Sequence, residues 1–121
     1  MSEYHQIFAQ AVVQERQLIA DVALAAGTEL PPAQNAVPAT IAYAGEVDGA
    51  AVEVELSHDF EDDRGIPFSR YPVVITIRAY NGDKTREERL ARGIFDKLCG
   101  RGSYSLLLVF GLQRLLGKCA P

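Results

Sequence analysis

Apolar side chains recur at three- and four-residue spacing through the first part of the chain. Between residues 2 and 26 this spacing places them on one face of an amphipathic helix, and Gly27 is a natural C-terminal stop. Glu15 falls in the middle of that apolar stripe and is expected to point toward the core. Because an unpaired buried carboxylate is costly, the pattern predicts that Glu15 pairs with an arginine, reaches a gap in the packing, or belongs to a pocket. The apolar positions are Tyr4, Ile7, Phe8, Ala11, Leu18, Ile19 and Val22.

The dipeptide Asp48-Gly49 is typical of a two-residue type I′ turn and predicts a β-hairpin. Pairing residues outward from this turn sorts apolar from polar side chains on both strands at once, which defines the register. One face then pairs Val47 with Ala50, Gly45 with Val52, Tyr43 with Val54 and Ile41 with Leu56. The opposite face carries the acidic side chains Glu46, Glu53 and Glu55.

The second half of the chain predicts a β-α-β unit. Residues 73–80 read as a strand, Asp83 can cap a helix over 84–99, and the apolar run 104–110 reads as a strand covered on both faces. A helix-containing connection of this kind is expected between two parallel strands with a right-handed crossover. Residues 112–118 predict either a short terminal helix or a bent continuation of the strand.

These elements predict a single domain over residues 1–121, of α+β or α/β class. The element order is α-β-β-β-α-β with a possible short C-terminal helix, and the sheet is one mixed sheet of four strands, an antiparallel hairpin joined to a parallel pair. Val74, Thr76, Tyr80 and the segment 106–110 present more apolar surface than two helices can cover, which favours a homodimer.

Charge is divided unequally along the chain. Residues 1–63 carry twelve acidic side chains against Arg16, whereas residues 64–121 carry eleven Lys and Arg against four acidic ones, for a net of −4. The halves therefore either neutralise each other inside the fold or face charged partners. Pairing across the sheet, for example of Glu53 or Glu55 with Arg78, is the expected route to neutralisation.

The densest group of acidic side chains follows the hairpin. Asp59, Glu61, Asp62 and Asp63 lie beside His58 but lack the alternate spacing and glycine of a calcium loop. With two histidines in the chain, a zinc site is also not expected, and we predict no metal and no cofactor. The group predicts either a solvated loop or a docking surface for a basic protein.

A smaller basic group lies on the second predicted helix. Arg86, Arg89 and Arg92 share its outer face, but Glu88 lies four residues before Arg92 and Asp96 four after it. This spacing favours ordinary ion pairs on a solvated helix face. The acidity of the whole chain also argues against nucleic-acid binding.

Cys99 and Cys119 lie outside any CxxC spacing and are expected to be two reduced thiols. The longest apolar run, 106–110, is too short to span a bilayer, and the first residues do not form a secretory leader. The expectation is a soluble cytoplasmic protein with no membrane contact.

The predicted element order is similar to the core of restriction-endonuclease-like nucleases. That resemblance implies a magnesium-binding acidic residue on the second strand, for which Glu53 or Glu55 could stand, and Glu15 resembles an extra acidic residue on the first helix. The third strand carries Thr76 and Arg78 where the family has Glu-x-Lys. The resemblance therefore implies at most a degenerate member of that fold.

Two functions follow from the sequence. The first is a non-enzymatic interaction domain of the immunity, inhibitor or adaptor type. It would bind a basic partner through the acidic hairpin and the loop residues Asp59, Glu61, Asp62 and Asp63. The alternative is an enzyme or ligand-binding protein whose pocket is formed by Glu15, Glu53, Glu55 and Arg78. The absence of an intact catalytic motif favours the first.

Overall fold

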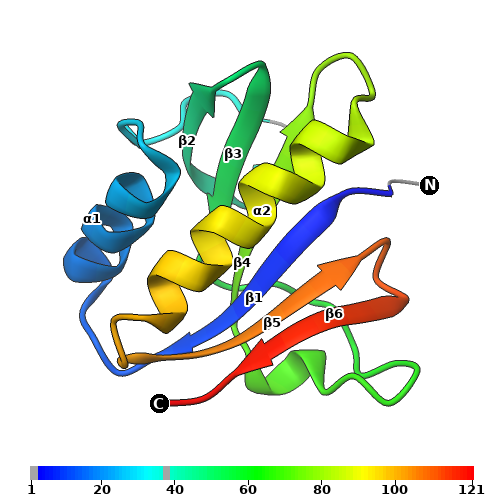
Figure 1. The fold of residues 1–121 in the computed structure, drawn as a ribbon. Coiled ribbons are helices and arrows are strands. Elements are labelled where there is room, and N and C mark those ends of the chain that lie inside the picture. The colour runs from blue at the N-terminus through cyan, green and yellow to red at the C-terminus, as the bar shows by residue number, and fades with distance from the viewer. Residues whose placement is uncertain (1–2, 37–38) are drawn as a thin grey trace.

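The computed structural model describes residues 3–36 and 39–121 and contains one sheet, two α-helices and a short 3₁₀ helix (Figure 1). The predicted helix start at residue 2 lies outside the described residues. The strands are β1 (His5–Ala11), β2 (Ile41–Val47), β3 (Ala50–Glu55), β4 (Val73–Ala79), β5 (Tyr104–Phe110) and β6 (Arg114–Cys119). The helices are α1 (Glu15–Ala26), η1 (Phe68–Arg70) and α2 (Lys84–Cys99).

The strands form one antiparallel sheet in the order β2-β3-β4-β1-β5-β6. The α+β class is confirmed, but the sheet has six strands rather than four and is antiparallel rather than mixed. β4 and β5, the predicted parallel neighbours, are separated by β1, which pairs antiparallel with both. They therefore run in the same direction without touching, and α2 connects them across β1 (Figure 1).

The prediction of a helix over residues 2–26 was wrong in its first half. Residues 5–11 form the central strand β1, and the helix begins only at Glu15. Ile7, Phe8 and Ala9 are all fully buried, because β1 is covered on both of its faces. A strand covered on both sides loses its apolar–polar alternation, so its apolar residues can imitate helical spacing by coincidence.

The predicted hairpin is confirmed over most of its length. Asp48 and Gly49 have φ of 50° and 75°, as a type I′ turn requires. The predicted pairs hold from Val47–Ala50 to Tyr43–Val54. The register then shifts by one residue, so that Ile41 lies opposite Glu55 and not opposite Leu56.

The prediction of the second helix is confirmed, whereas that of the C-terminal segment was wrong. α2 has the predicted bounds, and the Asp83 side chain accepts a hydrogen bond from the Arg86 N–H at 3.0 Å. Residues 114–119, by contrast, are neither helix nor a continuation of β5. They form β6, which returns antiparallel to β5. Gly111 and Leu112 both have positive φ, 63° and 60°, and reverse the chain at this point.

Apolar side chains form a core on each face of the sheet. The larger core lies between the sheet and both helices. The smaller core joins the opposite face to the connection 57–72. This connection covers Val74, Leu107 and Val109 of the surface on which the homodimer prediction rested, whereas Tyr80 stays exposed. The buried members of the smaller core are Phe8, Val74, Leu107 and Val109 from the sheet and Ile66, Phe68 and Tyr71 from the connection.

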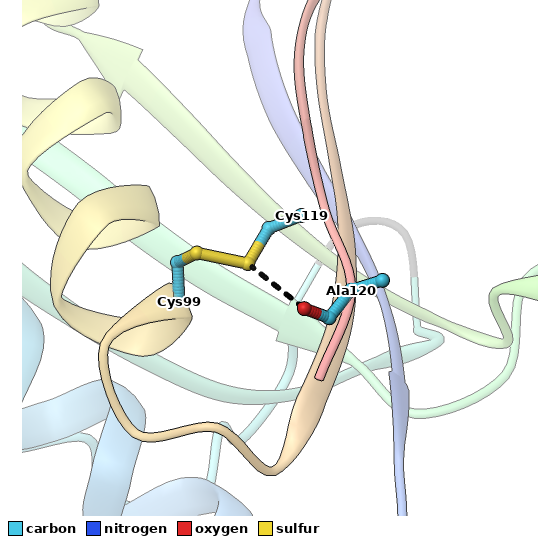
Figure 2. The surroundings of a disulfide bond; sticks show 3 residues. All are labelled: Cys99, Cys119 and Ala120. Atoms are coloured by element: carbon cyan, nitrogen blue, oxygen red, sulfur yellow. Dashed lines mark hydrogen bonds between the residues drawn. A yellow bond between two sulfur atoms is a disulfide. The ribbon is translucent and has the colours of Figure 1, made fainter.

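The two cysteines form a disulfide, contrary to the prediction of reduced thiols (Figure 2). Cys99 ends α2 and Cys119 ends β6, and their Cα atoms are 6.0 Å apart. Because β6 runs back along β5, it returns to the point where α2 passes into β5. The sequence did not indicate this proximity because β6 was not predicted as a separate strand.

No helix in the described residues is long and apolar enough to cross a membrane.

Candidate functional site

The predicted acidic loop lies on the sheet face opposite the helices. Asp59, Glu61, Asp62 and Asp63 are all exposed. They belong to the connection between β3 and β4, whose apolar residues pack into the smaller core. The four carboxylates are therefore carried by a segment that is anchored to the sheet.

Several hydrogen bonds fix the path of this loop. The His58 ring contacts the Tyr71 carbonyl through Nε2 at 2.5 Å and accepts the Phe60 N–H through Nδ1 at 3.0 Å. The Asp62 carboxylate accepts the Ser69 N–H at 2.8 Å, and this bond lowers the pKa of Asp62 below its ordinary value. Asp62 is thus held charged and in one place, whereas Asp59 and Glu61 extend freely into solvent.

The outer face of the hairpin lies on the same side of the sheet as this loop. Glu53 and Arg78 meet there at 3.3 Å, as the charge division predicted. Glu55 accepts a hydrogen bond from the Thr40 hydroxyl, and Glu46 lies within hydrogen-bonding reach of Tyr80. Burial and the neighbouring Glu46 raise the pKa of Tyr80.

The structure does not bring Glu15 to the other members of the predicted pocket. Glu15 is exposed at the first turn of α1 and accepts a hydrogen bond from the Tyr43 hydroxyl at 2.6 Å. Tyr43 lies opposite Val54, on the helix side of the sheet, whereas Glu53, Glu55 and Arg78 point to the other side. The sheet therefore separates Glu15 from the other three, and its partner is a tyrosine rather than an arginine.

The nuclease resemblance rested on an element order that the structure does not have. A strand precedes the first helix, and a further strand follows the last predicted one, so the order is β-α-β-β-β-α-β-β. Glu53 lies on the observed second strand of the hairpin, but it pairs with Arg78.

Two buried carboxylates escaped the sequence reasoning. Asp21 is 4% exposed and Glu87 is fully buried. Glu87 lies four residues before Ala91 and so continues the apolar stripe of α2. A carboxylate within an apolar helical stripe is thus the sequence signal for Glu87, as it was for Glu15, but the stripe of α2 is real and that of residues 2–14 is not.

Glu87 connects α2 to the first residue of β1 and to the last residue of β4. It accepts the backbone N–H groups of His5 at 3.1 Å and of Ala79 at 3.0 Å. The His5 ring approaches it through Nδ1 at 2.5 Å, and the Lys84 ammonium donates at 3.3 Å. These partners account for both carboxylate oxygens, which marks Glu87 as an anchor of the fold.

Asp21 performs a similar role at the other end of the helix layer. It accepts hydrogen bonds from the hydroxyl of Tyr104, from Arg101 at 2.9 Å and from Gln17 at 2.8 Å. Burial and the hydrogen bond to Asp21 raise the pKa of Tyr104. The cluster ties α1 to the start of β5.

Opposite charges from the two halves of the chain meet at few places. Among the described residues, Glu53–Arg78 and Asp21–Arg101 are the ion pairs that join a carboxylate of residues 1–63 to an arginine of residues 64–121. Arg92 pairs instead with Glu88 at 2.8 Å, as the helical spacing predicted. Most of the acidic charge therefore stays on the surface.

Over residues 3–36 and 39–121, no three His, Cys, Asp or Glu side chains are arranged to hold a metal ion. No protein-family model matches the chain, and no match was found among curated proteins or solved structures.

Proposed function

We propose that this chain is a non-enzymatic interaction domain, of the immunity, inhibitor or adaptor type, that binds a basic protein partner. Its docking surface is the acidic face, which we define as the outer side chains of the β2–β3 hairpin together with the loop 59–63. The observation that carries the proposal is the anchoring of that loop on a core of its own.

Anchoring matters because a flexible loop loses conformational freedom on binding. The hydrogen bonds of His58 and Asp62 and the burial of Ile66 and Phe68 order this loop before any partner arrives. A pre-ordered backbone reduces the cost of ordering the loop on association. The loop therefore presents its acidic side chains without first having to fold.

Charge on the acidic face is also incompletely neutralised. Arg78 offsets Glu53, but Glu46 and Glu55 contact neutral hydroxyl groups. A surface of net negative charge steers a positively charged partner and increases its association rate. The alternative, a pocket of Glu15 with Glu53, Glu55 and Arg78, has less support because the sheet lies between them.

The experiment compares two variants with the same change in charge. The loop variant carries Asp59→Asn, Glu61→Gln and Asp63→Asn, and it keeps Asp62 because that side chain holds the loop. The control variant carries Glu29→Gln, Glu88→Gln and Asp96→Asn. Glu88 and Asp96 lie on α2, on the helix side of the sheet, and Glu29 follows α1.

Each protein is immobilised and exposed to native lysate at low salt, and the retained proteins are quantified by mass spectrometry. We expect basic proteins held by the unaltered chain to be held equally by the control variant. The loop variant should retain them about tenfold less, and added salt should release them from all three. Equal retention by the loop variant and the unaltered chain would refute the proposal.

A further inference from the structure

A basic groove runs along α2 on the opposite side of the sheet from the acidic face. It is bounded by one face of α2, by the last turn of α1 and by the β2–β3 turn, and its volume is about 460 Å³. Figure 1 shows α2 lying across the sheet with α1 and the hairpin beside it. Its apolar part is formed by Ala25, Ala26, Leu90, Gly93 and Ile94.

Three cationic side chains line the groove. Arg86 donates to the Asp48 carbonyl at 3.1 Å, and Lys97 donates to the Ala25 carbonyl at 3.5 Å. Carbonyl oxygens do not neutralise these cations, and each keeps further N–H donors. The Arg86 guanidinium also forms an exposed ion pair with Asp83, with Nε and Oδ2 3.7 Å apart, and Asp48 lies in the groove lining. Arg89 is exposed and forms no ion pair with the described residues. The groove lining therefore carries a net positive charge, three cations against the single carboxylate of Asp48.

Gly93 lies between these cations, in the interior of α2. Glycine inside a helix is less favourable than alanine, so its presence calls for a reason. At Gly45 the reason is steric, because an added Cβ would lie 2.3 Å from the Glu29 carbonyl oxygen. At Gly93 an added Cβ would meet nothing within 4 Å, and φ is not positive. The fold itself therefore does not require glycine there.

Glycine on an open surface lets another chain approach the helix backbone closely. Gly93 lies one helical turn from Arg89 and one turn from Lys97. The position without a side chain therefore has a cation on either side of it along the helix. Arg86 and Lys97 are separated by about 16 Å along the helix axis. That length matches about five residues of an extended peptide.

We propose that this groove binds an extended acidic segment of a partner protein. The carboxylates of the segment would pair with Arg86 and Arg89 at one end and with Lys97 at the other, and its small central residues would lie against Gly93. With an acidic face on one side of the sheet and this groove on the other, the domain would connect two partners of opposite charge. The groove does not depend on the acidic face, so each proposal can fail alone.

The probe is a fluorescein-labelled peptide, Asp-Asp-Gly-Ala-Glu-Glu, with the Asn and Gln version as the neutral control. Binding is followed by fluorescence anisotropy at low salt, up to millimolar protein. Gly93→Leu adds a side chain to the groove at a position where its Cβ meets nothing within 4 Å, and Arg89→Glu reverses one charge. Arg92→Glu makes the same charge reversal outside the groove lining, and Gly93→Ala tests the cost of glycine.

We expect the unaltered chain and Arg92→Glu to bind the acidic peptide alike, and Gly93→Leu and Arg89→Glu to bind it about tenfold more weakly. Gly93→Ala should raise the thermal midpoint, because the fold gains helix propensity at that residue. The loop variant described above should bind the peptide at least as well as the unaltered chain.

Three results would overturn the proposal. The first is no measurable binding of the acidic peptide, and the second is equal binding by Gly93→Leu. The third is concentration-dependent self-association in sedimentation that both the loop variant and Gly93→Leu abolish, since that would assign the groove to a second copy of this chain.

Discussion

Replacing Glu87 tests whether this buried carboxylate is needed to hold α2 against the ends of β1 and β4. In Glu87→Ala the backbone N–H groups of His5 and Ala79 lose their acceptor in a place that water does not reach. Each unsatisfied buried donor costs about 1–3 kcal/mol. The two together give about 2–6 kcal/mol, and the loss of the contacts from the His5 ring and Lys84 favours the upper part of that range.

Glu87→Gln refines the test because it keeps the shape of the side chain. Its amide has one oxygen to accept a hydrogen bond, and its NH₂ must face either His5 or Ala79, both of which are donors. We therefore expect a loss of about 2–3 kcal/mol, smaller than for alanine but still a large part of the stability of a domain of this size. The control is Asp96→Asn on the same helix. Its carboxylate is exposed and forms no ion pair with the described residues, so the change should alter stability by at most about 0.5 kcal/mol.

The measurement is urea unfolding of the three variants and the unaltered chain, followed by circular dichroism with the disulfide intact. The slopes of the transitions should agree, so that the midpoints report stability directly. Glu87 is not an anchor of the fold if both Glu87 variants lie within about 1 kcal/mol of the unaltered chain, or if glutamine is more destabilising than alanine.

Three further predictions concern other parts of the fold. Reducing the Cys99–Cys119 disulfide, which closes a loop of 20 residues, should lower the free energy of unfolding by about 3 kcal/mol. The double Cys→Ala variant should be insensitive to reductant. An unchanged urea midpoint of the unaltered chain after reduction would count against the bond. Burial raises the pKa of Tyr104 above its ordinary value of 10.0, so stability should be complete below that pH and decline above it as the unfolded chain releases the proton. Urea midpoints from about pH 8 to about pH 11 should show this decline, and Tyr104→Phe should flatten it. A double-mutant cycle of Glu53→Gln with Arg78→Met should give a coupling below about 1 kcal/mol, since both side chains are partly exposed, and a larger value would mean that the pair is shielded from solvent.

Local chemistry predicted the elements whose signals lie within a few residues. The Asp48-Gly49 turn and the cap at Asp83 each act on adjacent backbone groups, so the hairpin and α2 could be predicted from the sequence alone. β1 could not, because Ile7, Phe8 and Ala9 are buried by elements far along the chain. The sequence pattern around them fits a helix equally well.

Some features of the candidate sites could likewise be predicted from the sequence, whereas others depend on tertiary packing. The exposure of the acidic loop and the Glu53–Arg78 pair follow from composition and register, and both could be anticipated. The anchoring of that loop by Phe68 could not, because it depends on the packing of the connection beneath the sheet. The basic groove also depends on tertiary structure, since only the fold brings the last turn of α1 and Asp48 to the same face of α2.

The central position of β1 also determines the order in which this chain can fold as it is synthesised. β1 is made early, yet His5 pairs with Ile77 and Phe110, so its neighbours in the sheet are translated much later. The hairpin can form from local contacts, but the middle of the sheet has to wait for residue 110. Until then Ile7 and Phe8 belong to an apolar strand without a sheet, the kind of segment that aggregates or binds chaperones.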